Sequence, residues 1–133
     1  MNIEILYPEY CNLYGDTGNI TFLKECLPDA NFIYTSLNEE PRFCKSKVDL
    51  IYIGPVTESA QEEIITLLMP YREKIEEQID NNVIFLVTGN AGEIFGNYIE
   101  KTDGSKIPAL GIFDIYSKRG DNDRFNELTL RNL

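Results

Sequence analysis

Val83-Ile-Phe-Leu-Val-Thr-Gly-Asn-Ala-Gly-Glu-Ile-Phe-Gly96 is the stretch that decides the fold. Its apolar run, Val83 to Val87, has the length and composition of a buried strand and stops at Thr88-Gly89-Asn90. A helical pattern follows and predicts a helix over about residues 91–100. In enzymes built on this strand–turn–helix unit, the residue at the tip of the turn is a nucleophilic Ser or Cys. Here the tip is Gly89, so the sequence predicts the scaffold of an active site without its nucleophile.

Strands and helices alternate along the rest of the chain. We expect strands at residues 2–7, 31–35, 49–53 and 83–87, a helix from Asp16 or Thr17 to about Leu27, and a long helix opened by Thr57 or Ser59 and kinked or split at Pro70. A turn at residues 102–105 and a last strand-like run at 109–116 complete the pattern. This alternation favours an α/β fold, a flavodoxin-like parallel sheet with helices on both faces.

The loops that follow parallel strands gather at one edge of the sheet, where binding sites form. We therefore expect loop 8–18, loop 54–60 and the elbow, defined here as residues 88–92, to lie close together. The candidate ligand-binding residues come from these three segments: Asn12, Tyr14, Asp16, Gly54, Gly89 and Asn90. The polar side chains of the first loop have a purely structural alternative, in which Asp16 and Asn19 cap the following helix.

Composition excludes several classes of function. The 133 residues are enough for a single domain, which we place at 1–133. A net charge of −10 argues against nucleic acid as a partner, and the one dense basic spot, Lys118-Arg119, precedes Asp121 and Asp123 and is typical of a solvated loop. No apolar run approaches the roughly 20 residues of a membrane span, and the N-terminus lacks a signal-peptide pattern. These features predict a cytoplasmic protein with no membrane partner.

The residues for covalent or metal chemistry are also missing. Cys11, Cys26 and Cys44 have unpatterned spacing, and the chain has no His, so we expect free thiols, no metal site and no cofactor. Without His, the usual base for a nucleophile is absent. Thr88 precedes the tip by one residue and is expected to point away from it. Cys11 has no visible base. Neither residue is a good substitute for the nucleophile.

Three segments carry a resemblance to a known family. They are Leu6-Tyr-Pro-Glu-Tyr-Cys-Asn-Leu-Tyr-Gly-Asp-Thr-Gly-Asn-Ile20, the loop from Gly54 to Gln61, and Gly89 to Gly96. The chain resembles class I glutamine amidotransferase domains of the cobyric acid synthase type, and most of all the glutaminase subunit of lipid II isoglutaminyl synthase. The resemblance covers about residues 3–116. It implies a flavodoxin-like fold and, in working relatives, glutamine hydrolysis with transfer of ammonia to a Mur-ligase-like or other amidating subunit.

The departures from that family concern its catalytic groups. The family elbow reads Cys-Gly-Gly-Tyr-Gln-Leu-Leu-Gly, so Gly89 replaces the nucleophile and Glu93 replaces Gln. Pro55 and Val56 replace glycines in the loop whose backbone helps form the family's oxyanion hole. The family's catalytic His comes from further downstream, and this chain has none. The sequence therefore predicts a degenerate amidotransferase-like domain without glutaminase activity, with a structural or regulatory role.

Two alternatives remain open at this point. The elbow could hold a small carboxylate or phosphate on backbone N–H groups at the start of the helix, as a binding module. The chain could instead be a truncated product of a longer amidotransferase gene. The resemblance also implies self-association or a partner, because relatives complete their sheet with a C-terminal half and the run Ile112–Tyr116 would otherwise leave an open edge.

Overall fold

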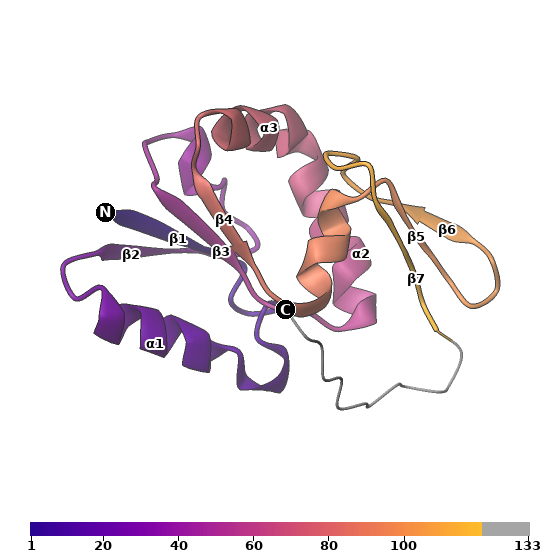
Figure 1. The fold of residues 1–133 in the computed structure, drawn as a ribbon, viewed down its shortest axis with the longest axis horizontal. Helices are drawn as coiled ribbons and strands as arrows, with labels where there is room; N and C mark the ends of the chain where they lie inside the picture. Colours follow the sequence, from indigo (N-terminus) through magenta and orange to yellow (C-terminus); the bar gives the residue numbers. More distant parts are fainter. Residues whose placement is uncertain (121–133) are drawn as a thin grey trace, which may run out of the picture.

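Four parallel strands form the central sheet of the computed structural model, which describes residues 1–120 (Figure 1). They are β1 (Asn2–Leu6), β2 (Asn31–Thr35), β3 (Leu50–Ile53) and β4 (Ile84–Val87), in the order β2-β1-β3-β4. This is the order of the first four strands in flavodoxin-like sheets. The expected strands and their parallel arrangement are confirmed, although β1 ends at Leu6 because Tyr7 has a positive φ of 51°.

Helices cover both faces of this sheet, as expected. The side chains of its two central strands, β1 and β3, are almost all buried. The helices are α1 (Thr17–Cys26), α2 (Glu58–Leu68) and α3 (Arg72–Asp80). Ile3 and Tyr52 pack with Ile20 of α1 on one face. On the other face Ile51 and Ile53 pack in a larger core with α2 and α3, which lie across the sheet from α1 (Figure 1). No helix within residues 1–120 is long and apolar enough to span a bilayer.

The long helix begins and divides where the sequence indicates. Thr57 caps α2, with its hydroxyl accepting a hydrogen bond from the Ala60 amide at 3.2 Å. Pro70 lies in a short 3-10 turn, η3 (Met69–Tyr71), between α2 and α3. Since proline has no amide hydrogen and crowds the preceding turn, the split at this residue follows from its chemistry.

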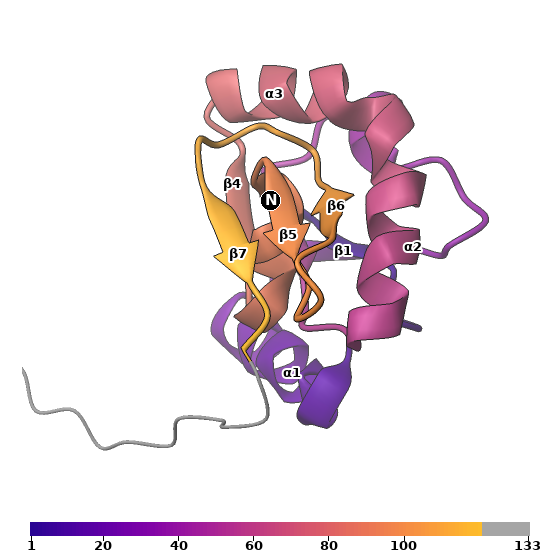
Figure 2. The ribbon, with the colours of Figure 1, turned by 90° about the vertical axis from the view of Figure 1, so that its right-hand side faces the viewer.

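The prediction of a helix at residues 91–100 is wrong. The elbow instead enters a 3-10 helix, η4 (Gly89–Phe95), which ends where Gly96 takes an extended conformation. Three short strands follow as a second sheet, in the order β6-β5-β7 (Figure 2): β5 (Tyr98–Glu100), β6 (Lys106–Pro108) and β7 (Tyr116–Lys118). The glycines at 92 and 96 weaken an α-helix, and pairing with β6 and β7 draws residues 98–100 into a strand.

The prediction of a strand at residues 109–116 is also wrong, except at Tyr116, where β7 begins. The backbone of this segment bonds to η4 instead, with the Leu110 amide donating to Ile94 O at 2.9 Å and the Ile112 amide to Phe95 O at 3.0 Å. The turn at 102–105 is confirmed and connects β5 to β6, with Gly104 at a φ of 81°.

The carboxylate of Glu4, in the central strand β1, is fully buried. Glu4 of β1 accepts hydrogen bonds from the Thr35 hydroxyl at 2.6 Å and from the amides of Arg42 and Phe43 at 2.5 and 2.9 Å. Burial raises the pKa of Glu4 above its ordinary value of 4.5, although these hydrogen bonds oppose the shift. Glu4 thus fixes the 3-10 turn at residues 42–44 to the sheet.

We predict that Glu4→Ala lowers the free energy of unfolding by about 2–4 kcal/mol, because two buried amides lose their acceptor. Urea denaturation measures this, and Glu39→Ala, which removes an exposed acceptor for the Ser36 amide, is the matched control. Because the folded state raises the pKa of Glu4, its proton is held more tightly there. The stability difference between wild type and Glu4→Ala should therefore be larger near pH 4.5 than at pH 8. A Glu4→Ala variant as stable as the control would contradict this role.

Candidate functional site

The three predicted segments meet at the carboxyl edge of the parallel sheet, which confirms their expected proximity. The Leu13 amide donates to Pro55 O at 3.0 Å and joins the first loop to the second. Asn90 of the elbow is bonded to Val56 of the second loop. Gly54 lies so close to the first loop that a Cβ there would be 2.2 Å from Cys11 O. A glycine is therefore required at residue 54 for packing alone.

Gly89, at the tip of the elbow, has a left-handed backbone conformation and little room for a side chain. Its φ is +57°, in the left-handed region that strains most other residues. A Cβ added to Gly89 would lie 2.8 Å from the Cβ of Pro55, closer than carbon atoms pack. Pro55 therefore occupies the space that the first side-chain atom of a nucleophile would need.

The side chain of Asn90 forms two hydrogen bonds with the backbone of the neighbouring loop. Its Oδ1 accepts a hydrogen bond from the Val56 amide at 3.0 Å, and its Nδ2 donates to Val56 O at 2.8 Å. The Val56 amide is therefore already bonded within the protein. Pro55, the residue before it, has no amide hydrogen to offer. The loop thus presents no free donor at either residue for an oxyanion.

Asp16 organises a polar cluster on the α1 side of the same edge. Its carboxylate accepts hydrogen bonds from Asn19 Nδ2 at 2.7 Å, from Thr88 Oγ1 at 3.2 Å and from the Tyr52 hydroxyl. Burial and the Asp16 carboxylate raise the pKa of Tyr52, so its hydroxyl remains a donor at neutral pH. Asp16 is the N-cap residue of α1, as the sequence-based alternative expects, but its side chain accepts no hydrogen bond from an amide of the helix. Asn12 Oδ1 accepts the Thr17 amide at 2.8 Å instead.

A pocket of about 500 Å³ lies beside this cluster. Its lining consists of Leu13, Tyr14, Pro55, Val56, Thr57, Glu58, Gly89 and Asn90. Of the six candidate ligand-binding residues, three line the pocket, and Asn12, Asp16 and Gly54 serve the surrounding structure. Thr88 is not part of the lining and points to Asp16. The lining includes one acid, Glu58, and no Lys or Arg, so its electrostatics do not favour an anion.

Cys11, the other nucleophile considered, is buried at the same edge. Burial, with a smaller effect of the nearby Asp16 carboxylate, raises the pKa of its thiol to about 12. The thiol is therefore protonated at neutral pH and lacks nucleophilic character. Within residues 1–120, no three Cys, Asp or Glu side chains are grouped in a way that could hold a metal ion.

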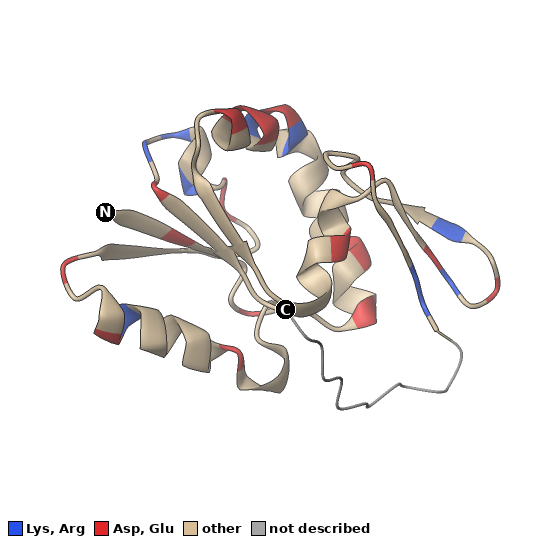
Figure 3. Cartoon of the chain, in the orientation of Figure 1, with Lys and Arg blue, Asp and Glu red and all other residues tan. Residues whose placement is uncertain are grey.

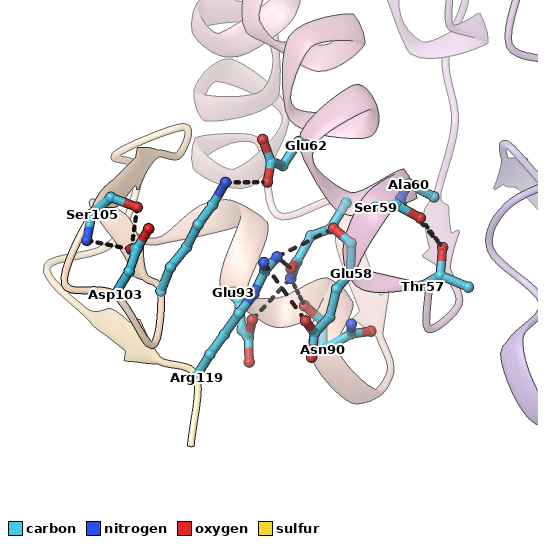
Figure 4. Close-up of polar contacts among 12 residues, drawn as sticks. Thr57, Glu58, Ser59, Ala60, Glu62, Asn90, Glu93, Asp103, Ser105 and Arg119 are labelled. Carbon is cyan, nitrogen blue, oxygen red and sulfur yellow. Dashed lines mark hydrogen bonds and ion pairs between the residues drawn. The ribbon is translucent and has the colours of Figure 1, made fainter. Parts of the chain in front are cut away.

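A buried polar chain behind the elbow was missed by sequence reasoning (Figure 4). The side chain of Gln61 in α2 is fully buried and donates to Asn90 O and to Glu93 Oε2, both at 2.9 Å. Its Oε1 accepts from Arg119 Nη2 at 3.2 Å, and Arg119 also donates to Glu58 O at 3.2 Å. The Arg119 side chain is only 16% exposed, so the prediction of a solvated loop is wrong for this residue.

Comparison with known proteins finds two relatives that have the same name. No protein-family model matches the chain. It is similar to the lipid II isoglutaminyl synthase (glutamine-hydrolyzing) subunit GatD of Streptococcus pneumoniae, with 29% identity over 129 residues, 94% of this chain and 49% of the relative. The protein of the same name from Staphylococcus aureus is 25% identical over 113 residues, 84% of this chain and 46% of the relative.

The chain therefore spans about half the length of the curated relatives it matches. These matches confirm the resemblance to this glutaminase subunit, and they support an amidotransferase-like domain. The match to the first relative includes 94% of the chain.

We predict that native protein reacts with iodoacetamide at Cys26 at least about 100-fold faster than at Cys11, because Cys26 is exposed and the Cys11 thiol is buried and protonated. Peptide mass spectrometry after timed labelling at pH 8 measures both rates. In urea the difference should disappear. Equal rates in the native protein would show that Cys11 is accessible and reactive after all.

Proposed function

We propose that this chain is a degenerate glutamine amidotransferase-like domain that does not hydrolyse glutamine and serves as a structural or regulatory partner of an amidating subunit. Its similarity to the GatD subunit over most of its length supports the amidotransferase-like character. Its elbow supports the loss of activity. Acyl transfer from glutamine requires a nucleophile, a base and donors for the oxyanion, and the chain lacks His altogether.

The contact between Pro55 and Gly89 is the observation that carries this proposal. A missing nucleophile alone would be one substitution away from recovery. Here the space for its Cβ is taken by Pro55, which lies 2.8 Å from where that atom would be. Asn90 also bonds the Val56 amide, in the loop that helps form the oxyanion hole of the resembling family. The neighbouring residues are thus adapted to a glycine at the tip.

The amidating partner is inferred from the relatives. The matched proteins are named as subunits of a glutamine-hydrolyzing synthase, so they function as part of an assembly. For this chain we propose a Mur-ligase-like amidating subunit as the partner. A binding module for a small carboxylate or phosphate has less support, because the elbow starts a seven-residue 3-10 helix and the pocket lining includes Glu58 but no basic side chain.

We predict no release of ammonia from glutamine above the uncatalysed background. A coupled assay for glutamate, with the chain alone and together with a Mur-ligase-like amidating subunit, measures this. Turnover that rises in proportion to the concentration of this chain and disappears in Cys11→Ser would contradict the proposal and identify Cys11 as the nucleophile.

A second prediction concerns the tip of the elbow. Gly89→Cys should lower the free energy of unfolding by about 1–3 kcal/mol, because the new Cβ is strained at positive φ and contacts Pro55. Gly18→Cys is the matched control, since a Cβ at Gly18 meets no atom within 4 Å. Pro55→Gly should relieve part of the cost in the double variant, whereas Pro55→Ala, which keeps the Cβ, should not.

Neither double variant should hydrolyse glutamine, because no His is present to protonate the leaving ammonia. Urea denaturation and the glutamate assay provide the two measurements. Glutaminase activity in Gly89→Cys would reveal an unrecognised base and overturn the proposal, and equal stability of Gly89→Cys and Gly18→Cys would show that Pro55 does not close the position.

A further inference from the structure

The outer edge of β4 is unpaired among the described residues. β4 is the last strand of the four-stranded sheet and pairs only with β3. The amides of Ile84 and Thr88 donate to Asp49 O and Ile53 O, on the β3 side. Because backbone groups alternate along a strand, the N–H and C=O groups of Phe85 and Val87 point toward the open edge. They are a template for a further strand.

Both faces of this edge are apolar. On the α1 side, Ile84 and Leu86 are 54% and 36% exposed. On the opposite side Phe85 and Val87 line a groove of about 330 Å³, together with Phe95, Phe113 and three further residues. A strand that pairs with β4 would therefore bury apolar side chains on both faces of the sheet.

The edge is also uncharged, like the strand at the opposite edge of the sheet, β2, but its uncharged segment is longer. Residues 81–92 contain no Asp, Glu, Lys or Arg, the longest such run in a sequence with a net charge of −10. Figure 3 colours the acidic residues red, and they lie on the helices, on other strands and in loops, with none on β4. Protected edges usually have a Lys, a Pro or a bulge, and residues 84–87 have neither of these residue types.

We propose that β4 pairs antiparallel with β4 of a second copy of this chain, about a two-fold axis, to form a continuous sheet with four strands from each copy. A second copy fits for two reasons. Its edge offers the same apolar side chains and unpaired amides, so the surface is self-complementary. The repulsion between two strongly acidic chains is weakest where each presents an uncharged segment.

Backbone bonding selects the register of the pair. Like faces must stay together, so the two-fold axis passes through residue 85 or residue 86. An axis at Phe85 would require the Val83 amide to pair across the edge, but that amide already donates to Gln78 O at 3.0 Å. An axis at Leu86 needs only the outward amides of Phe85 and Val87. Leu86 then lies opposite Leu86 of the second copy.

Sedimentation velocity across a concentration series tests the association. Wild type should shift from a 15.3 kDa monomer to twice that mass. Leu86→Lys should weaken the dimer at least about tenfold, since it places two charges opposite each other. Phe22→Lys, at an α1 residue that is 68% exposed, adds the same charge and should leave the dimer intact. Circular dichroism verifies folding. A monomer at every concentration, or a dimer unaffected by Leu86→Lys, would overturn the proposal.

Disulfide trapping tests the register without a new charge. In a Cys26→Ser background, Leu86→Cys places two thiols on directly opposite residues, whose Cα atoms are about 4.5 Å apart in such a pair. That separation permits a disulfide. Ile84→Cys is the control, because the two copies of residue 84 are offset by four residues, roughly 13 Å. Mild oxidation should give a covalent dimer with Leu86→Cys only. No cross-link, or equal cross-linking of both variants, would overturn the proposal even if Leu86→Lys failed to fold.

Discussion

The close approach of three backbone segments at the carboxyl edge of the sheet is the constraint on which the rest of the structure depends. Gly54 makes it possible, because any side chain there would collide with Cys11 O and with Asp16. With the first loop fixed against the end of β3, Asp16 reaches Tyr52 and Thr88, and Pro55 comes to lie against the tip of the elbow. The three segments are thus held together by close packing and hydrogen bonds, with the pocket of about 500 Å³ between them and the start of α2.

Several residues that differ from the amidotransferase pattern contact one another at this junction of three segments. Pro55 and Gly89 fit together because residue 89 has no Cβ, which would lie 2.8 Å from the Cβ of Pro55. The side chain of Asn90 then bonds both backbone groups of Val56, which a loop open to a substrate would leave available. Behind it, Gln61 links Glu93 to Arg119, so the carboxylate of Glu93 has a buried donor. Each of these residues is therefore held by a contact with a neighbour.

Sequence reasoning predicted the part of the fold that local patterns specify. Apolar strands, the cap at Thr57 and the split at Pro70 have local causes, and the four strands of the parallel sheet followed from them. Residues 89–118 were predicted poorly, because their conformation depends on bonds between distant residues, such as Leu110 to Ile94. The convergence of the three loops was predictable from topology, but the contact of Pro55 with Gly89 and the burial of Arg119 required the positions of side chains.

Strand β4 adjoins two unusual features of the structure, the elbow and an unpaired sheet edge. Its carboxyl end leads into the closed elbow, and its outer edge leaves the backbone groups of Phe85 and Val87 unpaired among the described residues. A strand flanked by neighbours on both sides is held in register by two ladders, whereas β4 is held by one. The contacts of Asn90 and Pro55 therefore also fix the end of an edge strand. The elbow thus acts as a structural anchor for a strand whose outer edge is apolar and uncharged.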